Sequence, residues 1–528
     1  MHIDARELTA DSQIEGDICI VGAGAAGISI ALEWVHSNAR VILLEGGGFN
    51  LEASLQDLYR GEITGKPYYP LQAARLHYFG GTTGHWAGFC SPYDSIDFQR
   101  RRWVPNSGWP ITRKQLDPYY RRAQQLVELG PYEYDPGYWE DQDADVVRLP
   151  YDRRKVHTKM WQFSPPTRFG TRYREAIVNA PNLQLYTNAN VCEIAANESV
   201  NSIEHLHIRT FDGKQHKVKA RYYILACGSI QNARLLLASN RRANTGLGNR
   251  HDLVGRYFME HVEMPVAELV LQRPRPLKMY LLNYGQTRSR GELALTPASQ
   301  REYRLLNGTV SLNPGGVGNN PRGTFQEFPA EVVLQYSDQS LPSPAEKKTV
   351  TEGRATPATP APASVSPYQV FKLTCRHEQS PNPDSRVRLG PDQDALGMPR
   401  AELHWQLTSL DKRSIRKSCE ILARETGRSR LGRVRLLEWL TTDNDDEWPD
   451  FLSGGWHHMG TTRMHEDPRQ GVVDADCRVH GINNLYLAGA SVFPTGGASN
   501  PTLTLIALSL RLSDYIKRQV GDVNIGLL

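Results

Sequence analysis

One stretch near the N-terminus constrains the fold more than any other part of the sequence. An apolar segment, Asp17–Val21, is followed by a glycine-rich turn, Gly22–Gly27, and by a helical run to His36. A second apolar segment, Arg40–Leu44, follows and leads into Glu45. Strand, glycine turn, helix and strand within about thirty residues form the βαβ unit of a dinucleotide-binding fold. The sequence therefore predicts an α/β protein with a Rossmann-like domain.

The glycines of this unit have separate physical roles. Gly22 allows the tight turn, Gly24 lets the backbone approach a pyrophosphate, and Gly27 lets the helix pack closely on the strand. Glu45 stands where a carboxylate accepts hydrogen bonds from ribose hydroxyls, and it would repel the 2′-phosphate of NADP. The unit predicts a bound dinucleotide and by itself leaves FAD and NAD open.

Length, charge and cysteine usage narrow the class of protein. A chain of 528 residues is too long for one ordinary core, so we expect two domains. The 61 basic residues nearly balance the 57 acidic ones, which argues against binding to nucleic acid. No apolar run is long enough to span a bilayer, and residues 1–16 lack the apolar stretch of a secretion signal. Seven scattered cysteines are typical of reduced thiols. We expect a cytoplasmic protein, with export alongside a partner left open.

The nucleotide-binding domain is predicted to be discontinuous. An apolar strand over 217–228, a helix over 231–238 and a strand over 484–488 continue its pattern late in the chain. Alternating segments such as 266–271 and 386–389 predict an antiparallel sheet in an inserted substrate domain. Six prolines within 342–367 predict an extended surface loop. The predicted nucleotide-binding segments are 1–100, 186–258 and 451–528, with a cap segment over 101–185 and a substrate-binding domain over 259–450.

Three further stretches carry residue types that chemistry needs. Residues 79–88 are rich in glycine and include His85 and Trp86, which suits a backbone lying against a flat ring. Residues 453–464 contain the pair His457-His458. Residues 495–501 end in Asn500-Pro501, where a helix running to about Lys517 is predicted to begin with Asn500 as its N-cap.

With these motifs in this order, the sequence resembles the glucose–methanol–choline (GMC) oxidoreductases over nearly its whole length. Within that family it is similar to the bacterial sugar and glycoside dehydrogenases and the pyranose oxidases. The resemblance implies FAD as the cofactor, bound by a Rossmann-like domain beside an inserted substrate domain on an antiparallel sheet. The residues it implies for FAD binding are Gly22, Gly24, Ala25, Ala26, Gly27, Glu45, Gly46, Gly81, Thr82, His85, Trp86, Ala87, Gly88, Val191, Ala226, Gly228, Gly489, Ala490, Asn500, Pro501 and Thr502.

The resemblance also implies the catalytic pair. His457 matches the family's histidine, whose neutral imidazole takes the hydroxyl proton while a hydride leaves carbon for flavin N5. Asn500 matches the second active-site residue and would hold the substrate oxygen. A metal site of His457, His458 and His465 is disfavoured, because no cysteine or acid pair stands at ligand spacing. His261 and Gln379 either line the pocket or are structural.

The implied reaction is the oxidation of an alcohol group of a sugar, glycoside or related polyol to a carbonyl. A non-sugar alcohol, an FAD-containing lyase and an accessory subunit are the alternatives. The electron acceptor is O₂, a quinone or a redox partner protein. In pyranose oxidases the histidine matching His85 carries the flavin covalently, but here Gly84 replaces the threonine before it. A covalent link to His85 is therefore left open.

Overall fold

The βαβ unit forms the centre of a parallel sheet. The computed structural model describes residues 1–284, 287–314, 369–442 and 444–521. Strands β3 (Ile18–Val21) and β4 (Val41–Leu44) flank helix α1 (Ala25–Glu33), and all eight strand residues are buried. The helix ends at Glu33, three residues before the predicted end at His36. The predicted α/β class and βαβ unit are confirmed.

Six parallel strands from distant parts of the sequence complete this sheet. Their order is β1 (His2–Asp4), β8 (Leu183–Thr187), β4, β3, β12 (Tyr222–Leu225) and β21 (Leu485–Leu487). Beside it lies a four-stranded sheet in the order β2 (Gln13–Glu15), β11 (Gln215–Lys219), β10 (Ile203–Arg209) and β9 (Asn190–Ala196). A sheet that begins with β1, at the start of the chain, is thus completed by β21 near its end.

The single strand predicted over 217–228 is wrong, because two strands occupy it. β11 alternates exposed and buried residues and pairs with β2 and β10, whereas β12 is largely buried in the parallel sheet. The chain changes sheets at Ala220 and Arg221, which carry no glycine or proline to mark the turn. Helix α8 (Ser229–Ala238) follows, starting two residues before the prediction.

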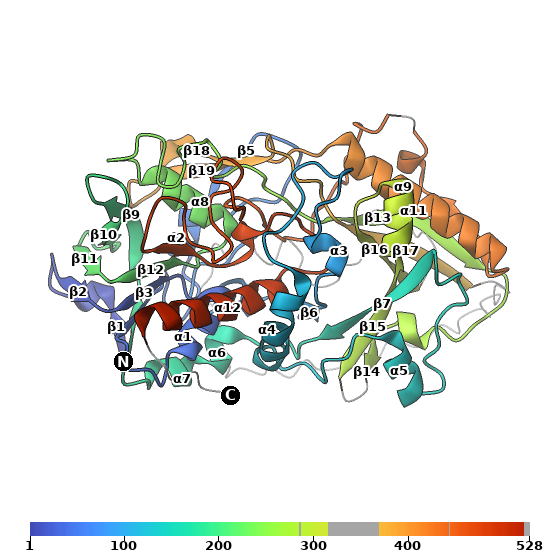
Figure 1. The fold of residues 1–528 in the computed structure, drawn as a ribbon, viewed down its shortest axis with the longest axis horizontal. Coiled ribbons are helices and arrows are strands. Elements are labelled where there is room, and N and C mark those ends of the chain that lie inside the picture. Colours follow the sequence, from blue (N-terminus) through green and yellow to red (C-terminus); the bar gives the residue numbers. More distant parts are fainter. Residues whose placement is uncertain (285–286, 315–368, 443, 522–528) are drawn as a thin grey trace, which may run out of the picture.

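An antiparallel sheet of eight strands lies at the opposite end of the long axis from the parallel sheet (Figure 1). Helix α11 (Ser409–Arg428) contacts it. The strand order is β20 (Gly432–Leu436), β13 (Val262–Leu271), β17 (Gln369–His377), β16 (Gly308–Pro314), β15 (Arg288–Leu295), β7 (Val156–Phe163) and β6 (Phe89–Cys90), with β14 (Asn283–Tyr284) beside β15.

The predicted strand at 386–389 does not join this sheet. It lies within β18 (Arg386–Gln393), which forms a separate sheet with β19 (Pro399–His404) and β5 (Gly61–Ile63). Between β17 and β18 the chain passes through Pro381 and Pro383, which have no amide N–H to extend a ladder. The Pro-rich segment 342–367 lies outside the described residues.

Helices α12 (Thr502–Val520) and α4 (Arg113–Leu126) pack together, and α12 also contacts α1 (Figure 1). α12 starts one residue later than predicted, with Pro501 in the flanking position. Among the described helices, none combines the length and apolarity that a membrane span requires. The short helices are α2 (Ala53–Gln56), α3 (Ser95–Phe98), α5 (Pro136–Gln142), α6 (Phe169–Arg172), α7 (Arg174–Val178) and α9 (Pro297–Tyr303).

Candidate active site

The glycine turn and the Gly80-Gly81 loop form a cradle at the start of α1. Gly22 has φ of +98°, and a Cβ on Gly27 would overlap the Gly22 carbonyl oxygen. The amide of Gly80 donates to the Ala23 carbonyl over 2.8 Å, which joins the two loops. A Cβ added at Gly24 would have no described heavy atom within 4 Å, apart from atoms of the adjacent residues in the chain. The cradle thus leaves room where the first helical turn points, as a bound pyrophosphate requires.

Glu45 fixes the glycine turn from the end of β4. It is 6% exposed, and its carboxylate accepts the amides of Ala23 (2.8 Å) and Gly47 (3.0 Å). These bonds hold the carboxylate beside the cradle, in the position where the ribose contact is predicted. The role toward ribose stays a prediction.

Several predicted cofactor residues lie at one edge of the parallel sheet. Leu225 of β12 is in register with Val21 of β3 and Leu487 of β21. The residues that follow these three strands therefore meet at their carboxyl ends, where open α/β sheets bind ligands. At Gly228 and Gly489, as at Gly24, a Cβ would meet no described heavy atom beyond its neighbours within 4 Å. The residues present fit a dinucleotide such as FAD.

The remaining predicted cofactor residues lie on other elements. Gly81 and Thr82 belong to a 3₁₀ turn, and the Trp86 indole donates to the Thr167 carbonyl over 2.9 Å. The His85 ring lies 6.0 Å from the Trp456 ring, and burial lowers the pKa of His85 to about 4. Val191 lies in β9 of the four-stranded sheet. It directly follows Asn190, whose side-chain amide donates to the Gly46 carbonyl over 3.1 Å.

The two predicted catalytic residues come together. Nδ2 of Asn500 donates to Nε2 of His457 over 2.9 Å, although the residues lie on different loops. The Asn500 side chain makes no capping bond to α12, so the predicted N-cap role is wrong: the amide turns toward the histidine. Its Oδ1 finds no hydrogen-bond partner among the residues the structure describes. A buried amide oxygen without a partner indicates a place for a hydroxyl donor.

His261, which the sequence left between a pocket and a structural role, contacts His457 directly. Its Nδ1 lies 2.9 Å from Nδ1 of His457, and its Nε2 lies 3.1 Å and 2.9 Å from the carbonyl oxygens of Gly496 and Gly497. Gln379 is structural, because its side-chain amide bonds to the backbone of Phe258 and Glu260.

Glu260 was missed by the sequence reasoning. One oxygen of its buried carboxylate accepts the backbone amides of both His457 (2.7 Å) and His261 (2.8 Å). The other oxygen accepts the Tyr68 hydroxyl. Burial raises the pKa of Glu260 to about 7. The available signal was the run Glu260–Glu263, in which three ionisable side chains stand within four residues at the start of a largely apolar strand.

The charges around His457 keep its imidazole neutral. Burial, and then the neighbouring His261, Arg376 and His458, hold the pKa of His457 well below its usual value. Glu263 lies 3.7 Å from Nδ1 of His457 but is paired with Arg376 at 2.7 Å. A neutral imidazole is the form that can accept a proton.

Two histidine clusters bear on metal binding. Ligand atoms of His261, Glu263 and His457 all lie within 4.8 Å of one another. In this structure the two ring nitrogens face each other at hydrogen-bond distance, and the carboxylate pairs with Arg376. In the other cluster, Nε2 of His458 lies 2.9 Å from the Tyr68 hydroxyl, and Nδ1 of His465 accepts the Asp467 amide. These contacts engage the candidate ligand atoms within the protein.

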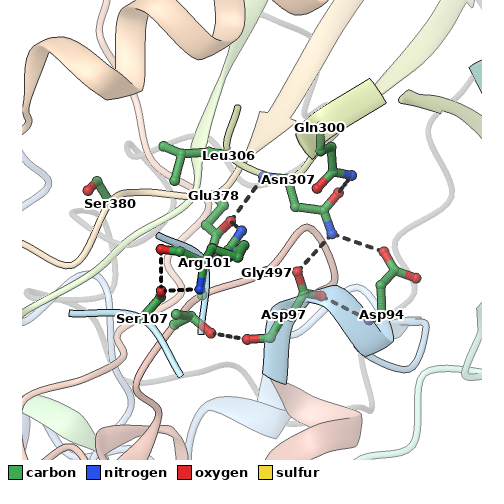
Figure 2. Close-up of polar contacts among 12 residues, drawn as sticks. Asp94, Asp97, Arg101, Ser107, Gln300, Leu306, Asn307, Glu378, Ser380 and Gly497 are labelled. Carbon is green, nitrogen blue, oxygen red and sulfur yellow. Dashed lines mark hydrogen bonds and ion pairs between the residues drawn. The ribbon is translucent and has the colours of Figure 1, made fainter. Parts of the chain in front are cut away.

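A buried polar network supports the loop that carries Gly496 and Gly497 (Figure 2). The Thr495 hydroxyl donates to the Asp97 carbonyl over 2.7 Å, and the Trp109 indole donates to that hydroxyl over 2.7 Å. The Asn307 amide then bonds to the carboxylates of Asp97 (2.9 Å) and Asp94 (3.0 Å). The loop is therefore anchored through side chains that are all buried except the half-buried Asp94.

Comparisons with known proteins identify similar families and relatives. A family model described as FAD dependent oxidoreductase matches residues 17–268, and one described as GMC oxidoreductase matches residues 381–509. The chain is 24% identical to 2-methyl-1,2-propanediol dehydrogenase of Mycolicibacterium austroafricanum, over 96% of both chains. It is 24% identical to the large subunit of fructose dehydrogenase from Gluconobacter japonicus, over 96% of this chain and 98% of that one.

Solved structures share the fold. Pyridoxine 4-oxidase from Mesorbium loti superimposes with a TM-score of 0.57 at 18% identity, over 95% of this chain and 99% of that one. The fold, the cradle and the family matches define an FAD-dependent oxidoreductase. More narrowly, residues 381–509 match the GMC oxidoreductase family, the family that the sequence motifs predicted.

Proposed function

We propose that this protein oxidises a CH–OH group of a sugar or related polyol to a carbonyl, with His457 as the base. The observation that carries the proposal is the contact between Nε2 of His457 and the Asn500 amide, made by residues from two separate loops. The relatives described above are named for a diol and a sugar, which supports this substrate class.

His457 and Asn500 have separate roles in the proposed reaction. When the substrate hydroxyl replaces the Asn500 amide at Nε2 of His457, that nitrogen takes the hydroxyl proton and the amide N–H turns to hold the substrate oxygen. FAD, when bound, supplies a two-electron acceptor for the hydride that leaves the carbinol carbon. Loss of one proton and one hydride converts the alcohol to a carbonyl, so atoms and electrons balance. The burial of His457 keeps its nitrogen unprotonated before the substrate arrives.

The test is anaerobic mixing of the holoenzyme with a panel of pyranoses, glycosides and polyols, followed by flavin absorbance. We expect at least one sugar or polyol to bleach the flavin. His457→Ala should slow bleaching by about 10³-fold or more while FAD stays bound. His465→Ala, in the same segment but bonded to the Asp467 amide, is the matched control and should bleach normally.

Bleaching that persists unchanged in His457→Ala would overturn the base assignment. Turnover with a persistently oxidised spectrum would indicate the lyase alternative instead. Reoxidation of the bleached sample by air or by a quinone then identifies the electron acceptor.

A further inference from the structure

His261 and His457 make a contact in which the position of each proton can be deduced. The deduction starts from the loop carbonyls. Oxygen atoms of Gly496 and Gly497 both lie within 3.1 Å of Nε2 of His261. A carbonyl oxygen only accepts, so Nε2 of His261 must carry a hydrogen. A bare nitrogen there would face two acceptors and leave all three without a donor.

The second step concerns the other nitrogen of His261. Burial, reinforced by Arg376, lowers the pKa of His261 to about 4, so the ring is neutral and holds a single hydrogen. With that hydrogen on Nε2, Nδ1 of His261 is an acceptor. The group facing it at 2.9 Å is Nδ1 of His457, which must therefore be the donor.

The third step reaches the reacting atom. His457 is also neutral, so a hydrogen on its Nδ1 leaves its Nε2 bare. The Asn500 amide agrees with this direction, because its Nδ2 donates to that nitrogen over 2.9 Å. Each link in the series from the Gly497 carbonyl to Asn500 then pairs one donor with one acceptor.

We propose that His261 is a positioning residue that fixes the tautomer of His457, so that Nε2 of His457 is the proton-accepting atom. This proposal rests on the proposed function, since it concerns the base of that reaction. The opposite tautomer would place a hydrogen on the nitrogen that must take the substrate proton.

The surrounding structure holds this series in place from both sides. One oxygen of Glu260 accepts the backbone amides of both histidines, which fixes their main chains relative to each other. Gly497 has φ of +57°, and a Cβ there would lie 2.7 Å from the Asp97 carboxylate, so the loop packs directly on the buried network (Figure 2). The same loop continues to Asn500, so it contacts both ends of the series.

Nuclear magnetic resonance of the holoenzyme labelled with ¹⁵N-histidine tests the proposal without substrate. Protonated and bare ring nitrogens resonate far apart, and the His457 signals are assigned by their loss in His457→Gln. We expect Nδ1 of His457 to be protonated and Nε2 bare over the neutral pH range. A protonated Nε2 in the wild type would overturn the proposal, whatever the substrate proves to be.

Two substitutions test the same point by kinetics. In His261→Gln, the side-chain oxygen can accept from His457 while the amide nitrogen donates to the loop carbonyls. In His261→Leu neither bond is possible. We expect flavin reduction at saturating substrate to fall less than about tenfold in the glutamine variant and about 10²-fold in the leucine variant, with substrate affinity little changed.

The control is His377→Gln, which alters another buried histidine, 2% exposed, that lies outside this series. It should reduce its flavin at the wild-type rate. Equal rates in the glutamine and leucine variants at equal FAD content would overturn the positioning role. If His261→Leu fails to retain FAD, the wild-type tautomer and the glutamine variant still decide. Failure of the proposed function has a different signature, because His457→Ala would then bleach normally.

Discussion

The dinucleotide cradle and the histidine pair are built in different ways. The cradle is local: Gly22, Gly27 and Glu45 belong to one βαβ unit, and their contacts are with one another and with a neighbouring loop. The candidate site around His457 is not local, because His261 precedes β13 of the antiparallel sheet while Asn500 precedes α12. A cradle substitution should therefore affect cofactor retention, whereas a pocket substitution should affect rate alone.

Gly27→Ala is expected to have the largest effect, because it breaks the cradle. A Cβ there would overlap the Gly22 carbonyl oxygen, which is backbone and cannot rotate away. We expect the variant to lose FAD and to unfold more easily, by about 1–3 kcal/mol or more. Visible absorbance after gel filtration and a thermal melt measure both.

Gly427→Ala is the matched control. Gly427 lies within α11, and a Cβ there would meet no described heavy atom outside the local helix within 4 Å. Gly427 lies in the last turn of α11, where alanine is still favoured over glycine, so stability should rise by up to about 1 kcal/mol with FAD retained. If Gly27→Ala bound FAD fully and were as stable as the wild type, the turn would have space for a Cβ, contrary to the structure.

Asn500→Ala should change the pocket and spare the cradle. Removing the amide donor beside Nε2 of His457 is expected to slow flavin reduction by about 10²-fold, at wild-type FAD content. Stopped-flow absorbance measures the rate. The matched asparagine is Asn484, whose side chain bonds the backbone of Ile203 over 2.8 Å and 3.0 Å. Asn484→Ala should lower stability and leave the rate of flavin reduction unchanged. A slower rate in Asn484→Ala with an unchanged rate in Asn500→Ala would contradict the separation of the two regions.

The sequence predicted the local parts of the fold well for a physical reason. Each strand of the βαβ unit is buried on both sides, so its apolar run is continuous and visible. The merged strand over 217–228 shows the limit. The turn at Ala220 and Arg221 has no residue that demands a special backbone angle, so nothing local marks the change of sheet.

The candidate site was predicted in part. His457 and Asn500 stand in recognisable motifs, and the fold brings them within hydrogen-bond distance. The contacts of His261 and Glu260 depend on how the start of β13 meets the loop at 453–460. That meeting is a product of tertiary packing between segments almost two hundred residues apart in sequence. No local pattern encodes it.

The role of Glu260, whose carboxylate bonds to the backbone of both histidines, is tested by measuring the free energy of unfolding at several pH values. Burial raises its pKa from 4.5 to about 7, so the folded protein holds a proton that the unfolded chain releases. The unfolded state binds fewer protons between these values, so the free energy of unfolding decreases as pH rises from about 4.5 to about 7. Glu260→Gln should remove about 2–3 kcal/mol of that decrease, measured by urea unfolding at several pH values.

Glu260→Gln is a mild change in geometry, because its amide oxygen can still accept the His457 and His261 amides and its nitrogen can donate to Tyr68. The comparison with wild type isolates this one carboxyl from other buried acids such as Asp97, whose pKa is also raised to about 7 by burial and Asp94. Identical pH dependence in the two proteins would mean that Glu260 is ionised throughout.

The smallest expected effect concerns how the cradle retains its cofactor. In the family pattern that the sequence resembles, a threonine precedes the histidine matching His85, where this chain has Gly84. A Cβ at position 84 would overlap the Tyr78 hydroxyl, so the tyrosine takes the space that a threonine would need. We therefore expect FAD without a covalent bond, fully released into the supernatant by acid precipitation. Yellow colour that stays with the pellet would contradict this. Gly84→Thr paired with Tyr78→Phe then examines whether removing the hydroxyl makes room for the threonine, with FAD content as the readout.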